Sequence, residues 1–183
     1  IGSLYDNAAA IDTAYSDPIS AYFDSMYDGQ SYAIKNIEIQ DTMQCIGVFG
    51  VTVGAQLRQI ILYSDRGSKI VNLPTGKNWY CLGGLVGLAA RRGAAGSASF
   101  ENCTVSGYQI VDERSKGYSS TEYTPGCGGG CVGGLVGATN MKITLCTAVT
   151  DITMDIGYYV GWMNVRVGGI AGVCRGEVNE CYA

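Results

Sequence analysis

The stretch Leu82-Gly-Gly-Leu-Val-Gly87 decides the fold of this chain, because the sequence repeats it. The related stretches are Val132-Gly-Gly-Leu-Val-Gly137, Val167-Gly-Gly-Ile-Ala-Gly172 and a degenerate Ile46-Gly-Val-Phe-Gly50. Their final glycines, at 50, 87, 137 and 172, are 37, 50 and 35 residues apart. Self-similarity at such periods is typical of solenoid architectures, in which each repeat buries its apolar face against the next.

A second short element follows each glycine stretch. The four copies are Leu57-Arg-Gln-Ile60, Phe100-Glu-Asn-Cys103, Ile143-Thr-Leu-Cys146 and Val178-Asn-Glu-Cys181. Both kinds of element consist of a few β-branched or aliphatic residues without the 3.6-residue period of an amphipathic helix, so they are predicted to be short β-strands.

Stacked repeats place equivalent residues in columns about 4.8 Å apart. The predicted columns are Cys45, Leu82, Val132 and Val167; Val48, Leu85, Leu135 and Ile170; Ile60, Cys103, Cys146 and Cys181; and the glycines 47, 84, 134 and 169. Exchange of isoleucine with cysteine in the third column is typical of buried positions, because a thiol packs as a small hydrophobe.

The repeat glycines are expected where the backbone turns sharply or approaches another backbone. They are Gly47, Gly50, Gly83, Gly84, Gly87, Gly133, Gly134, Gly137, Gly168, Gly169 and Gly172. The run Gly128–Gly134 lacks the Lys-Ser/Thr of a phosphate-binding loop, so the repeat explains its glycines better.

The predicted fold is all-β: a short parallel β-helix, or β-solenoid, of about four rungs over residues 34–183, with a small N-terminal helical cap. Residues 1–33 do not repeat. Ser16-Asp17-Pro18 is a helix-start pattern and Gly29 a helix stop. This segment either caps the open end of the solenoid or docks on a neighbouring subunit. The polar stretch 112–126 is predicted to be a loop inserted into the array.

The repeat resembles GLUG repeats, which occur in surface proteins and have a GGLVG-like motif followed by a strand that ends in Asn-Cys-Tyr. The closest counterparts here are Phe100-Glu-Asn-Cys-Thr104 and the ending Cys181-Tyr-Ala183. The resemblance covers about residues 34–183, including the leading strand Ile34–Ile39. It implies a parallel β-helix, a role at the cell surface and no catalytic residue.

Composition excludes several classes of activity. The chain of 183 residues contains no histidine, which removes Ser–His triads, Cys–His dyads and histidine-ligated zinc. The net charge of −4 argues against nucleic acid as a partner. No apolar run approaches the roughly 20 residues that span a bilayer. We therefore expect no enzyme activity, cofactor or metal, and no membrane span.

Eight cysteines, an even number, favour an extracellular location with the signal peptide removed. Cys81 and Cys131 precede equivalent glycine stretches and are the disulfide candidates, although in-register side chains would need local distortion to join. Cys103, Cys146 and Cys181 are interpreted as an inward apolar column rather than metal ligands. Asn102-Cys-Thr104 matches a glycosylation sequon.

These features predict an extracellular structural or adhesive protein, preferably a subunit that forms filaments or surface layers. Its partners would be copies of itself, added head to tail at the repeat edge near Cys181-Tyr-Ala183, or a cell-surface or glycan ligand. The alternatives are an adhesin fragment and a module that binds or cleaves carbohydrate, for which Asp151/Asp155 and Glu177/Glu180 are the acid pairs. Binding of a host protein would use the 112–126 loop.

Overall fold

The computed structural model describes residues 22–73, 79–91, 98–113, 129–154 and 164–183, and these are all-β. Their strands lie in four sheets, each named here after its first strand. The β1 sheet contains β1 (Met26–Asp28), β6 (Gln56–Arg58), β11 (Ser99–Glu101), β15 (Lys142–Thr144) and β19 (Val178–Asn179). The β2 sheet contains β2 (Ala33–Lys35), β3 (Ile39–Asp41), β7 (Ile61–Tyr63), β8 (Lys69–Asn72), β12 (Thr104–Asp112) and β16 (Thr147–Met154).

The other two sheets contain the glycine stretches. The β4 sheet contains β4 (Cys45–Ile46), β9 (Trp79–Gly83), β13 (Gly129–Gly133) and β17 (Asn164–Gly168). The β5 sheet contains β5 (Phe49–Val53), β10 (Val86–Ala90), β14 (Val136–Thr139) and β18 (Ala171–Cys174). Among the described residues, the named strands all pair in parallel.

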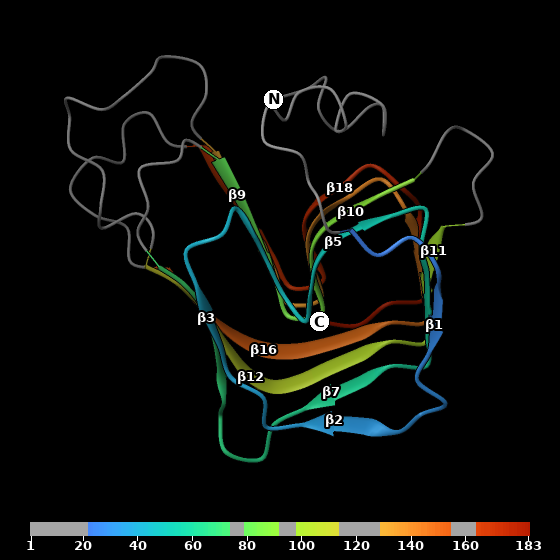
Figure 1. The fold of residues 1–183 in the computed structure, drawn as a ribbon, viewed down its shortest axis with the longest axis horizontal. Coiled ribbons are helices and arrows are strands. Elements are labelled where there is room, and N and C mark those ends of the chain that lie inside the picture. Colours follow the sequence, from blue (N-terminus) through green and yellow to red (C-terminus); the bar gives the residue numbers. More distant parts are fainter. Residues whose placement is uncertain (1–21, 74–78, 92–97, 114–128, 155–163) are drawn as a thin grey trace.

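The chain visits these sheets in a constant order. From β4 onward it passes through the β4, β5, β1 and β2 sheets and then starts again with β9 and with β13. The last pass runs through β17, β18 and β19 and ends at a bridge from Tyr182 to Thr147 of β16. Figure 1 shows the sheets arranged around a common interior. Leu57, Phe100 and Ile143, which are equivalent residues of three passes, are fully buried there.

The register confirms most of the columns predicted from the sequence. Leu82, Val132 and Val167 are neighbours in the β4 sheet. Ile60, Cys103, Cys146 and Cys181 each precede residues that are aligned across the β2 sheet.

The prediction for the first repeat was wrong by one residue, because Ile46 and not Cys45 aligns with Leu82. The β5 sheet keeps Phe49 opposite Val86, so the first repeat is one residue shorter at the corner between the two strands.

Residues 22–29 are extended, which corrects the prediction of a helix ending at Gly29. Phe23 bridges to Thr52, and β1 pairs with β6. Phe23 and Tyr27 pack against Phe49 of the β5 sheet. The ring centroids are 5.3 Å apart for Phe23 and Phe49 and 5.7 Å apart for Tyr27 and Phe49. This tertiary packing overrides a local helix signal. The predicted helix start at 16–18 lies outside the described residues.

Paired glycines form the corner between the β4 and β5 sheets, which points towards the β2 sheet. A Cβ atom at Gly84 would lie 2.7 Å from Cγ1 of Val105 in β12 and would also collide with the carbonyl oxygen of Gly134. At Gly134 a Cβ atom would lie 2.7 Å from Oγ1 of Thr150 in β16 and would collide with the carbonyl of Gly169. Close approach of another backbone, as expected from the sequence, therefore explains both glycines.

Candidate functional site

A second corner, where the β1 sheet meets the β2 sheet, has a regular and unusual backbone. Gln59, Asn102, Leu145 and Glu180 occupy equivalent positions there, with φ angles of 50°, 53°, 55° and 51°. This left-handed conformation suits glycine and asparagine and is costly for leucine. The second repeat element therefore consists of the end of one strand of the β1 sheet and this corner, and the strand of the β2 sheet begins at the next residue.

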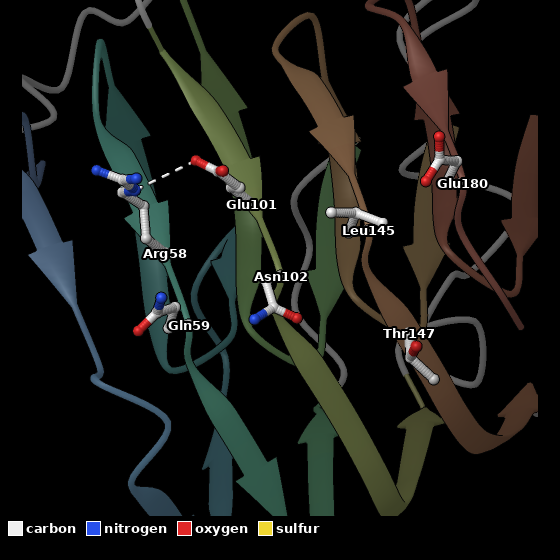
Figure 2. A pocket seen from close by; sticks show the side chains of 7 residues that line it. All are labelled: Arg58, Gln59, Glu101, Asn102, Leu145, Thr147 and Glu180. Atoms are coloured by element: carbon white, nitrogen blue, oxygen red, sulfur yellow. Dashed lines mark ion pairs between the residues drawn. The ribbon is translucent and has the colours of Figure 1, made fainter.

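A groove of about 450 Å³ runs along this left-handed corner. Figure 2 shows side chains of successive strands lining it: Arg58, Gln59, Glu101, Asn102, Leu145, Thr147 and Glu180. Sequence reasoning placed Asn102 and Glu180 among candidate residues, the first as a glycosylation site and the second as an acid, but missed the groove. Their shared position, one residue before the Ile60/Cys103/Cys146/Cys181 column, was the signal that could have found it.

The charged groups of the groove are one guanidinium, Arg58, and two carboxylates, Glu101 and Glu180. Arg58 Nε lies 3.2 Å from Oε2 of Glu101, and both side chains are close to half exposed. Glu180 is two strands away from Glu101, because Asn102, Leu145 and Glu180 follow aligned residues of β11, β15 and β19. The arrangement offers a guanidinium, amides and carboxylates to a polar ligand.

The repeat glycines at 50, 87, 137 and 172 form another column, in the β5 sheet. A Cβ atom at Gly87 would lie 2.6 Å from the backbone nitrogen of Ile46, and one at Gly137 would lie 2.7 Å from that of Leu82. These glycines let the β5 sheet approach the backbone of the β4 sheet. The contact is closest at Gly87, Gly137 and Gly172, whereas a Cβ atom at Gly50 would lie 3.1 Å from the carbonyl oxygen of Cys45.

Cys81 and Cys131 are in-register neighbours, as predicted, and Cys45 is the next residue of the same column. All three are buried and belong to a small apolar cluster of their own, with Leu88, Ala90 and Ala138 of the β5 sheet. Sequence reasoning missed this cluster, which is separate from the main core. No disulfide joins cysteines in the part of the chain that the structure describes.

Cys103, Cys146 and Cys181 point inward, and the first two are fully buried. The amide nitrogen of Cys103 donates to Sγ of Cys146 over 3.4 Å, and the Cys103 thiol donates to the carbonyl of Leu57. A hydrogen bond with Cys103 and burial raise the pKa of Cys146 above its ordinary value. Burial also raises the pKa of Cys181. The same hydrogen bond with Cys146 lowers the pKa of Cys103, so of these three thiols only those of Cys146 and Cys181 are held more firmly protonated by the fold.

The acid pairs proposed from the sequence do not form a common site. Asp151 is exposed in β16 and aligns with Gln109, while Asp155 lies outside the described residues. Glu177 lies 3.4 Å from Nζ of Lys142 on the surface, whereas Glu180 lines the groove.

The predicted loop at residues 112–126 begins one residue too early. Asp112 is the buried last residue of β12 and accepts a hydrogen bond from the Tyr80 hydroxyl. Residues 114–126 of the predicted loop lie outside the described residues.

Within the described ranges, no cluster of three or more histidine, cysteine or acidic residues is arranged to hold a metal ion. The same part of the chain has no helix that is long and apolar enough to cross a membrane. Comparison of the chain with protein-family models, with curated proteins and with solved structures gave no match.

Proposed function

We propose that this chain is a non-catalytic extracellular structural protein that folds as a short parallel β-helix and associates with further copies of itself. The constant order in which the chain visits four parallel sheets supports the β-helix, with each pass forming one rung. The likeness of residues 34–183 to GLUG repeats belongs to the same proposal, as does the extracellular location, which rests on the eight cysteines and the absence of histidine.

The exposure of inward-facing apolar side chains in the last strands carries the proposal of self-association. Val167 and Val178 are 51% and 48% exposed, although Val132 and Ile143, their neighbours in the same columns, are fully buried. The strands that bear them, β17 and β19, each pair on one side only among the described residues. An edge of this kind accepts a further parallel strand.

Electron microscopy of the purified chain over a range of concentrations tests this function. We expect elongated particles whose length grows with concentration, because a head-to-tail contact that does not close propagates. Isolated globular particles at every concentration would contradict self-association.

The groove at the left-handed corner favours a second candidate, a module that binds carbohydrate. Its guanidinium, amide and carboxylate groups are the partners that sugar hydroxyls use. A glycan array with the wild-type chain and with Arg58→Ala tests this, and binding should be lost in the variant. A reducing-end assay would detect cleavage of carbohydrate. Asp151→Asn is its control, because loss of cleavage in this variant would assign the activity to an acid outside the groove. An array without signal would remove this candidate.

A further inference from the structure

One column of the β1 sheet is lined by apolar and aromatic side chains, and among the described residues its two end strands, β1 and β19, each pair on one side only. Tyr27, Leu57, Phe100, Ile143 and Val178 are successive neighbours in it. The three middle residues are fully buried, whereas Tyr27 is 38% and Val178 48% exposed. The strands at the two ends are parallel, so one end matches the other by simple translation along the stack.

We propose that a second copy of this chain docks with its β1 in parallel register beside β19, which continues each column of the β1 sheet from one molecule into the next. This inference rests on the self-association proposed above and specifies its register. Tyr27 of the second copy then covers Val178. Aromatic and β-branched residues in adjacent strands form favourable pairs.

The β5 sheet extends in the same way. Phe23 bridges to Thr52, whose column continues through Ala89 and Thr139 to Cys174. The translated copy therefore places its Phe23 against Cys174, a half-buried residue packed on the main core. The following residues, Asp24 and Arg175, are both exposed and carry opposite charges, so the same register brings them together.

The polar columns of the β1 sheet are also compatible with this register. Asp28 of the second copy meets Asn179, whose amide can donate to the carboxylate. Glu177 meets Met26 of the copy. Glu180 follows Asn179 and meets Gly29, so the register opposes no like charges in this sheet.

Substitutions at Asn179 test the register, with light scattering of the full chain reporting the concentration at which it associates. Asn179→Asp places two carboxylates side by side and should weaken association about two- to fivefold, while Asn179→Lys should strengthen it by about the same factor. Thr144→Asp is the matched control, because Thr144 belongs to the same outward column one strand inside the stack. It should leave association unchanged.

The double variant Asp28→Asn with Asn179→Asp exchanges donor and acceptor and should restore association to the wild-type level. Far-ultraviolet circular dichroism confirms that each variant is folded. Association that ignores all three changes at 28 and 179 would overturn the register while leaving self-association intact. A wild-type chain that stays monomeric would overturn both.

Discussion

At the scale of single residues, Leu145 is the least favourable member of the left-handed corner. Its φ angle is 55° and its side chain is 48% exposed, so the backbone strain gains little packing in return. Leu145→Asn should stabilise the fold by about 1 kcal/mol, because asparagine tolerates this conformation, as Asn102 does. Urea unfolding measures the change. Val149→Asn, at an equally exposed strand position, should give no gain.

Substitution of Gly134 tests whether the backbones of successive repeats approach closely at the paired-glycine corner. A methyl group there meets the carbonyl of Gly169 and Oγ1 of Thr150, so Gly134→Ala should destabilise the protein by about 1–3 kcal/mol. Gly50→Ala is the control, since its Cβ would lie no closer than 3.1 Å to a neighbour. Equal thermal stability of the two variants would argue against the packed corner.

The buried thiols predict how stability depends on alkaline pH. Because the pKa of Cys146 is raised in the folded state, the unfolded chain loses this proton first, near the ordinary value of 9.0. The contribution of Cys146 to the free energy of unfolding should therefore be constant below pH 9 and fall above it, whereas the lowered pKa of Cys103 adds a contribution that rises as the pH approaches 9. Cys146→Val should flatten part of that fall, since Cys174, Cys181 and Tyr108 also have raised pKa values. Denaturant titrations at several pH values measure the free energy of unfolding. If it fell equally steeply with pH in the wild type and in Cys146→Val, the raised pKa of Cys146 would be contradicted.

At the scale of one strand, two neighbouring residues of β15 allow the contribution of core packing to stability to be compared with that of a surface ion pair. Ile143 is fully buried, and Ile143→Ala should cost about 2–5 kcal/mol through lost contacts and the cavity left behind. Lys142 forms a solvated ion pair with Glu177, so Lys142→Ala should cost less than about 1 kcal/mol. Chemical unfolding compares them, and a larger loss for the lysine variant would reverse the inferred faces of the strand.

Sequence repetition predicted the register wherever the repeats keep their length. Leu82, Val132 and Val167 could be aligned because each begins the same apolar-Gly-Gly stretch. The first repeat lacks one glycine, and the sequence alone does not say on which side of the corner the missing residue falls. Side-chain packing in two sheets decides this, by keeping Ile46 beside Leu82 and Phe49 beside Val86.

Other features depend on contacts between distant segments and could not be read locally. The helix signals lie at residues 16–18 and at Gly29, yet Phe23 and Tyr27 pack on Phe49 and residues 22–29 are extended. The groove needs both Arg58 and Glu101, which are neighbours only after the strands align. Repeats predict which residues are equivalent, whereas the shape of each corner depends on what packs against it.

At the scale of the whole molecule, the proposed self-association depends on the parallel stacking of the strands. The apolar columns of the interior reach the last strands at Val167 and Val178, where the side chains are half exposed. Continuing the stack into another copy buries this surface without any new fold. The central consequence that we propose for this architecture is self-association.

Sedimentation velocity of the wild-type chain over a wide concentration range tests that consequence most directly. The account predicts sedimentation coefficients that rise steadily with concentration and reach no fixed oligomer, because a translated contact does not close on itself. A single species with the mass of one 19.3 kDa chain at every concentration would contradict it.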